Sequence, residues 1–100
     1  MAFSFRLTRD AQQDLKAIRR YTVDRWGQEQ SRKYLEGMQN TIRLLAEFPV
    51  QGLARQDVDA GVFSFPYGSH MLYYRLEEEQ LMVFAVLHQR MVPERHLKGR

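Results

Sequence analysis

The residues that follow the last apolar run of this chain are the ones whose types and spacing most clearly indicate chemistry. The segment 88–100, HQRMVPERHLKGR, contains one acid, Glu94, and four cations, which are Arg90, Arg95, Lys98 and Arg100. Its net charge equals the +3 of the whole chain, so the residues before it sum to zero. Guanidinium groups that are held in place pair bidentately with carboxylates or phosphates. The segment therefore predicts an anionic partner.

Whether these cations form a binding surface depends on whether the segment packs against the protein. Charges near a chain end are commonly only solvated. Here apolar residues are interleaved with the cations, namely Met91, Val92, Pro93 and Leu97. We therefore favour a packed basic element over a solvated tail. A net charge of +3 is too mild to predict nucleic-acid binding by itself.

The three histidines, His70, His88 and His96, are the other candidates for chemistry. A metal site needs several convergent ligands, and these residues follow no recognised ligand spacing; the chain also has no cysteine. We expect no metal and no cofactor. His70 and His88 lie on or beside predicted strands, where a buried imidazole bonded to a backbone group is the more common arrangement.

Length and composition limit the organisation that can position these residues. A chain of 100 residues with 44% apolar content fits one packed domain, 1–100. Without cysteines it has no disulfide frame, which suits a reducing cytosol. No apolar run approaches the roughly 20 residues of a membrane-spanning helix, and the start lacks a signal-peptide pattern. We expect a cytoplasmic protein without membrane contact.

Helical periodicity dominates the first half of the chain. Residues 3–7 alternate as in a strand with one buried face, including Phe3, and Thr8 is placed to cap the helix that follows. That helix carries apolar residues at steps of three and four and should end at Gly27. A second helix is predicted from Gln28 to Glu47, before Pro49. The short connection makes the two helices an antiparallel pair.

The second half of the chain predicts strands. Residues 49–61 lack periodicity and are predicted to form a loop, and the apolar runs 62–65, 70–76 and 81–87 are separated by segments short enough for hairpin turns. A short turn or helix should follow Pro93. The order strand, helix, helix, strand, strand, strand predicts an α+β fold in which a helical hairpin packs on a mainly antiparallel sheet in two layers.

Three segments carry a resemblance to a known family: FRLTRDAQQDLKAIRRYTVDRWG at the start, VFSFPYGSHMLYYR later, and VLHQRMVPERHL near the end. In this order and spacing they resemble the ParE branch of the RelE/ParE toxin superfamily over almost the whole chain. An acidic residue is common in that branch where Val92 stands here. The resemblance implies a two-layer RelE/ParE-like fold.

The resemblance also implies a function. ParE-like proteins are generally toxins of type II toxin-antitoxin systems that trap DNA gyrase with cleaved DNA, and a ParD-like antitoxin neutralises them in a hetero-oligomer. RelE-like relatives instead cut messenger RNA on the ribosome, and the two activities share one scaffold. We expect the gyrase-directed activity, with ribosome-dependent mRNA endoribonuclease as the alternative.

The residue types present allow the ribonuclease alternative to be assessed. RNA cleavage without a metal needs a base, an acid and cations that stabilise the phosphorane. Five residues could in principle supply these groups: Arg55, Arg75, His88, Arg90 and His96. RelE-like nucleases usually have an Arg where Arg90 stands and many follow it with a Tyr, whereas this chain has His96 in that neighbourhood. The lysines are Lys16 and Lys33 on predicted helices and Lys98 near the end. The catalytic set looks incomplete, so we assign no catalytic residue.

Two sets of contacts are expected instead. The target-binding set consists of Arg90, Arg95, His96, Lys98 and Arg100, although a basic segment of this kind could meet gyrase or the antitoxin. The antitoxin-binding set consists of Tyr34, Tyr73 and Arg75, because the chain has more large aromatic residues than a small core can hide and some should line a groove. Trp26, beside Gly27, is interpreted as a side chain that covers the turn between the two helices.

Overall fold

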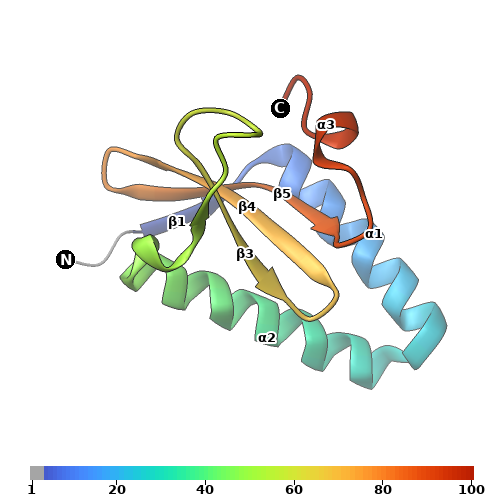
Figure 1. Cartoon of the computed structure of the whole chain (residues 1–100). Helices are drawn as coiled ribbons and strands as arrows, with labels where there is room; N and C mark the ends of the chain where they lie inside the picture. The colour runs from blue at the N-terminus through green and yellow to red at the C-terminus, as the bar shows by residue number, and fades with distance from the viewer. Residues whose placement is uncertain (1–3) are drawn as a thin grey trace.

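Two long helices and a five-stranded sheet form the protein in this computed structural model, which describes residues 4–100 (Figure 1). The elements are β1 (Ser4–Leu7), α1 (Arg9–Trp26), α2 (Gln28–Glu47), the 3₁₀ helix η1 (Pro49–Gln51), β2 (Leu53–Ala54), β3 (Val62–Tyr67), β4 (His70–Glu77), β5 (Gln80–His88) and α3 (Pro93–His96). The α+β class is confirmed, and the predicted helices and strands occur in the predicted order, with η1 and β2 in addition. Phe3, predicted to begin the first strand, lies outside the described residues.

The helical hairpin is bounded by the residues that the sequence indicated, a capping threonine and a glycine turn. Thr8 accepts a hydrogen bond from the Ala11 amide through its side chain at 3.2 Å and so caps α1. Gly27 joins the helices at φ 89°, a conformation that a residue with a Cβ adopts at a cost. Thr22 and Ser31 then pair their buried hydroxyls across the hairpin at 2.7 Å. The turn therefore places α1 and α2 side by side.

The sheet has the order β1-β5-β4-β3-β2, in which β1 runs parallel to β5 and the other neighbours are antiparallel. The prediction that residues 49–61 form only a loop is wrong, because η1 and the edge strand β2 lie within them. β2 has two residues, which pair with Ser64 and Phe63 of β3. A strand of two residues forms only through its pairing with a neighbour and is too short to show an alternating sequence pattern.

Each face of the sheet carries a hydrophobic cluster. The larger cluster lies under α1 and α2 and includes Met38 and Ile42 of the hairpin and Leu72 and Tyr74 of β4. The smaller one lies on the other face, which we call the outer face. Leu97, after α3, and Val58, of the loop before β3, pack there. The C-terminal segment is therefore part of the packed structure (Figure 1).

A bulge in β5 changes which of its residues face each cluster. Tyr73 pairs with Ala85 and Tyr74 pairs with Val83, so Phe84 has no partner in the register. The extra residue places Phe84 and Ala85 together in the outer cluster, while Val83 and Val86 belong to the helix-side cluster. The predicted core strand over residues 81–87 is thus confirmed, with a bulge that the apolar run did not indicate.

Candidate binding site at the C-terminal segment

The segment that follows β5 is held by backbone hydrogen bonds and by one buried side chain. The Met91 amide donates to the His88 carbonyl at 2.9 Å, and the Leu97 amide donates to the Pro93 carbonyl at 2.9 Å. The Leu97 side chain is buried in the outer cluster. The expectation that the basic element packs down agrees with these contacts. Leu97 provides the packing, whereas Met91 and Val92 are exposed.

The far end of the segment is fixed by an ion pair at an open edge of the sheet. β1 pairs with β5 only as far as Val83, so β5 continues beyond its neighbour. Asp14 of α1 accepts a hydrogen bond from the Val86 amide at 2.9 Å, and Arg100 donates to the Phe84 carbonyl at 3.4 Å. The two side chains therefore satisfy backbone groups that a neighbouring strand would otherwise pair with.

Arg100 and Asp14 also bind each other directly. Their closest contacts are 2.6 Å to Oδ2 and 3.1 Å to Oδ1, and the two side chains are only 18% and 16% exposed. The hydrogen bonds that Arg100 donates to Asp14 raise the pKa of its guanidinium above its ordinary value. We call this arrangement of Asp14, Arg100 and the β5 edge the edge clamp. Arg100, expected in the target-binding set, is thus engaged within the protein.

The other members of the expected target-binding set, Arg90, Arg95, His96 and Lys98, are exposed. Within residues 4–100, no carboxylate lies within ion-pairing distance of any of these four side chains. Arg90 and His96 line the same groove, which runs between α1 and the end of β5, whereas Lys98 lines a cavity on the outer face. The segment therefore presents cations in more than one direction.

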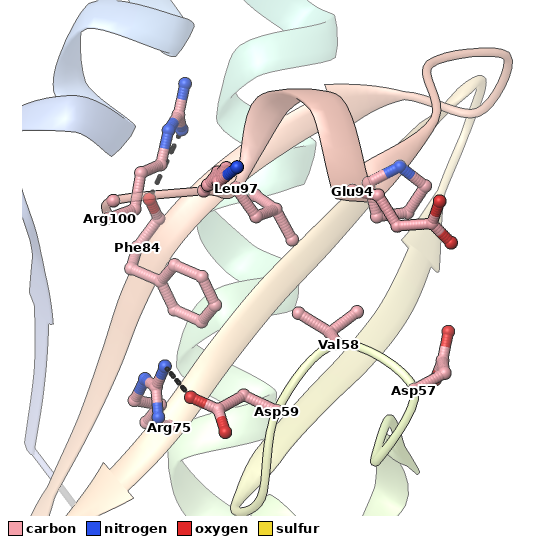
Figure 2. A pocket seen from close by; sticks show the side chains of 11 residues that line it. Asp57, Val58, Asp59, Arg75, Phe84, Glu94, Leu97 and Arg100 are labelled. Carbon is pink, nitrogen blue, oxygen red and sulfur yellow. Dashed lines mark hydrogen bonds and ion pairs between the residues drawn. The ribbon is translucent and has the colours of Figure 1, made fainter.

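That outer-face cavity has a volume of about 380 Å³ and lies between the loop 57–59 and α3. Figure 2 shows Val58, Phe84 and Leu97 pointing into it from three different parts of the chain. At its border the Arg75 guanidinium lies 3.4 Å from Asp59 and 5.1 Å from the centre of the Phe84 ring. Arg75 is therefore held on the outer face by an acid and an aromatic ring.

Arg55 has a similar environment on the same face. It pairs with Asp57 at 2.9 Å, and its guanidinium lies 5.5 Å from the centre of the Tyr73 ring. The hydrogen bonds that Arg55 donates to Asp57 raise the pKa of the Arg55 guanidinium and lower the pKa of the Asp57 carboxyl. Arg55 and Arg75 are thus both neutralised by aspartates of the loop that precedes β3.

The aromatic residues expected to line a groove are mostly turned inward. Tyr73 is 3% exposed in the outer cluster. Tyr34 packs on the opposite face of the sheet, where its hydroxyl lies 2.7 Å from His70 Nδ1 and accepts from the Ser69 amide at 3.2 Å. Tyr73 and Arg75 therefore share the outer face, and the structure does not bring Tyr34 together with them.

Tyr34 belongs to a network that joins α2 to the turn between β3 and β4. The Tyr67 hydroxyl donates to the Tyr34 carbonyl at 2.7 Å, and the Tyr34 ring also packs against the Tyr67 ring. Burial lowers the pKa of His70, with a smaller contribution from the nearby His88, and burial raises the pKa of Tyr67. His70 is buried as predicted, but its partner is a tyrosine hydroxyl and not a backbone group.

Several large apolar residues are exposed. Tyr21 and Trp26 of the hairpin are among them, which agrees with the expectation that the core cannot hide all the large aromatic residues, although Tyr21 also has the helical spacing of a core residue. Trp26 packs its ring edge against Tyr34 at a centroid distance of 5.6 Å, so it covers the turn only in part. A second exposed group lies at the end of α2 and in β2 and consists of Leu44, Phe48, Val50 and Leu53. Helical spacing shows which residues share one face of a helix. It does not show how much of that face the sheet covers.

Neither metal ligands nor a membrane helix are found in the part of the chain that the structure describes. Within residues 4–100, no three His, Asp or Glu side chains are placed to hold a metal ion. None of the helices in that range is long and apolar enough to cross a bilayer.

Comparison with known proteins yields a family and several relatives. The family described as "ParE toxin of type II toxin-antitoxin system, parDE" matches residues 5–93. Toxin ParE1 of Caulobacter vibrioides is 38% identical over 93 residues, which cover 93% of this chain and 96% of the relative. Toxin ParE1 of Mycobacterium tuberculosis is 38% identical over 98 residues, which cover 97% of this chain and 100% of the relative.

Two solved structures share the fold. One is described as the chromosomal ParDE TA system from P. aeruginosa, with a TM-score of 0.76 and 21% identity over 87% of this chain and 96% of that chain. The other is the toxin-antitoxin complex RelBE2 from Mycobacterium tuberculosis, with a TM-score of 0.61 and 20% identity over 88% of this chain and 99% of that chain. At these identities the likeness concerns the fold alone.

Proposed function

Because this chain belongs to the ParE family of toxins of type II toxin-antitoxin systems, we propose that it inhibits DNA gyrase by binding the enzyme and trapping its complex with cleaved DNA. It acts in the cytoplasm and needs no cofactor. A ParD-like antitoxin binds it in a hetero-oligomer and neutralises it. The ParDE and RelBE2 structures that share its fold are described as a toxin-antitoxin system and a toxin-antitoxin complex, which supports a partner of that kind.

The observation that carries this proposal is the array of exposed arginines after β5, Arg90 and Arg95, whose side chains have no ion-pair partner among residues 4–100. Arg90 and Arg95 are exposed, and Leu97 and the edge clamp hold the segment that bears them. A guanidinium carried by a packed segment loses less freedom on binding a carboxylate or a phosphate than one carried by a flexible tail. Such an array suits recognition of an acidic protein surface, of DNA phosphates held by the enzyme, or of both.

The placement of the remaining basic residues supports binding over catalysis. A ribonuclease needs a base, an acid and free cations that converge on one phosphate. Arg55 and Arg75 lie on the outer face and are paired with Asp57 and Asp59. Arg90 lies apart from them, in the groove between α1 and the end of β5, together with His70, His88 and His96. Of these histidines, His70 is buried and bound to the Tyr34 hydroxyl. RNA cleavage remains the alternative function, and the experiments below distinguish it from gyrase inhibition.

Replacing Arg90 and Arg95 together by Ala tests the role of the array. A hydrogen bond to a charged group contributes roughly 1.5–3 kcal/mol. Two exposed groups at the lower end of that range contribute about 3 kcal/mol, so losing both should weaken gyrase inhibition on the order of 100-fold. The matched control is Arg20→Ala with Lys33→Ala, which removes the same charge from exposed positions on the two helices. The control should inhibit gyrase like the parent.

The thermal unfolding temperature of both double variants should stay close to that of the parent, because all four side chains are exposed. If the Arg90 and Arg95 variant inhibits gyrase as well as the control does, the array is not the target contact. If it unfolds, the segment contributes to the fold through these arginines and the assignment is wrong. Mapping of RNA ends after induction of the toxin distinguishes ribosome-dependent cleavage from gyrase inhibition.

A further inference from the structure

A groove of about 500 Å³ separates α1 from the end of β5 and the segment that follows it. Ala17, Ile18 and Tyr21 form the helical wall, at the three- and four-residue spacing of one helix face. The opposite wall includes Leu87, Arg90 and Met91. The edge clamp closes one end, since Asp14 and Arg100 both line the groove. The groove is thus a concavity between two elements that is closed at one end by an ion pair.

Large apolar side chains are exposed at this groove. Tyr21 is 52% exposed and Met91 is 44% exposed, and neither belongs to a hydrophobic cluster of the core. The Arg25 guanidinium lies 5.1 Å from the centre of the Tyr21 ring, a cation–π contact along the same helix. An aromatic ring and a flexible methionine beside a concavity are typical of surfaces that bury an apolar side chain of a partner.

The charges of the lining select an acidic partner. Its only carboxylate, Asp14, is already bound by Arg100 and by the Val86 amide. Arg90 also lines the groove, and no carboxylate of residues 4–100 lies within ion-pairing distance of its side chain. The remaining polar lining consists of His70, His88 and His96. The charge left without a partner is therefore positive.

We propose that this groove receives an apolar side chain from an acidic segment of the antitoxin, which places a neighbouring carboxylate on Arg90. This inference rests on the proposed function. A segment seated here covers Arg90 and His96, which belong to the set proposed to meet the target. One contact therefore explains both how the antitoxin is recognised and how it excludes gyrase. A narrow groove with one helical wall suits an extended or helical segment better than the convex surface of a large folded enzyme.

The test uses the double variant Tyr21→Ala with Met91→Ser and, as matched control, Leu44→Ala with Val50→Ser, which trims exposed apolar residues outside the groove. Binding of the full-length ParD-like antitoxin encoded with the toxin is measured by calorimetry, and inhibition of gyrase is measured without antitoxin. The groove variant should bind the antitoxin at least tenfold more weakly, while the control changes less than threefold. Both should still inhibit gyrase, and both should unfold near the parent temperature.

The inference is overturned if the groove variant binds the antitoxin as tightly as the parent, or if the control weakens binding equally. It is also overturned if the groove variant keeps antitoxin binding and loses gyrase inhibition, because the groove is then a target contact. Should the parent itself not inhibit gyrase, the proposed function fails, but the antitoxin titration still decides the role of the groove.

Discussion

The edge clamp makes a quantitative prediction about stability. Asp14→Asn keeps the shape of the side chain and an oxygen that can accept from the Val86 amide, but it removes the charge that binds Arg100. The pair is 18% and 16% exposed, which lies between a fully buried pair, whose disruption costs roughly 3–5 kcal/mol, and an exposed pair at roughly 0.2–1 kcal/mol. We expect the substitution to cost about 2 kcal/mol.

This value is large enough to measure directly. For a domain of this length, 1 kcal/mol corresponds to about 4–8 °C in the unfolding temperature, so Asp14→Asn should lower it by roughly 8–16 °C. The matched control is Glu36→Gln, which breaks the ion pair of Glu36 with Arg32 at 2.8 Å between exposed side chains. The control should change the unfolding temperature very little, because solvent screens that pair.

Two further measurements localise the effect. Amide hydrogen exchange at Val86 should be faster in Asp14→Asn than in the parent, since the acceptor of that amide is weaker. The double variant Asp14→Asn with Arg100→Ala should cost less than the sum of the single variants, because both act on one contact. If Asp14→Asn unfolds within about 2 °C of the control, the reasoning about the clamp is refuted, since the cost would be that of an exposed pair.

Two more predictions concern the network between α2 and the turn of β3 and β4. Burial lowers the pKa of His70, so its neutral form stabilises the fold above about pH 6.5 and stability should decline as the pH falls from there through the lowered pKa. Denaturation with urea between pH 7.5 and 5.0 should show this decline in the parent and not in His70→Gln; equal slopes would contradict it. Gly37→Ala should destabilise the protein although alanine favours helices by about 1 kcal/mol, because the added Cβ would meet the Tyr67 hydroxyl. Tyr67→Phe in the same chain should remove that penalty, and a stabilised Gly37→Ala single variant would show that the ring moves freely.

The elements of the fold could be predicted because their signals are local. Thr8 and Gly27 bound α1, and both act through the backbone beside them. The strands 62–67, 70–77 and 80–88 follow apolar runs separated by short turns. The edge strand β2 has only two residues and exists through its pairing with β3, so no local pattern could reveal it.

The candidate site was less predictable because its contacts join distant residues. Counting charges identified the basic segment but could not show that Arg100 is engaged by Asp14, which is 86 positions away. Tyr34 and Tyr73 were expected to line a groove, yet Tyr73 is buried in the outer cluster and Tyr34 is partly buried by its contacts with His70 and Tyr67. Conversely, Tyr21 has the spacing of a core residue but lies where α1 extends past β1. Burial of a single side chain depends on what the rest of the chain places over it.

The central claim, that this toxin acts on DNA gyrase through the cations after β5, is tested most directly with purified gyrase. Supercoiling and DNA cleavage are followed while the toxin is titrated, in parallel with the double variant Arg90→Ala and Arg95→Ala. The account predicts loss of supercoiling and accumulation of cleaved DNA with the parent, and a shift of roughly 100-fold in the effective concentration for the variant. Normal supercoiling without trapped cleaved DNA, even with the toxin in large excess, would contradict it.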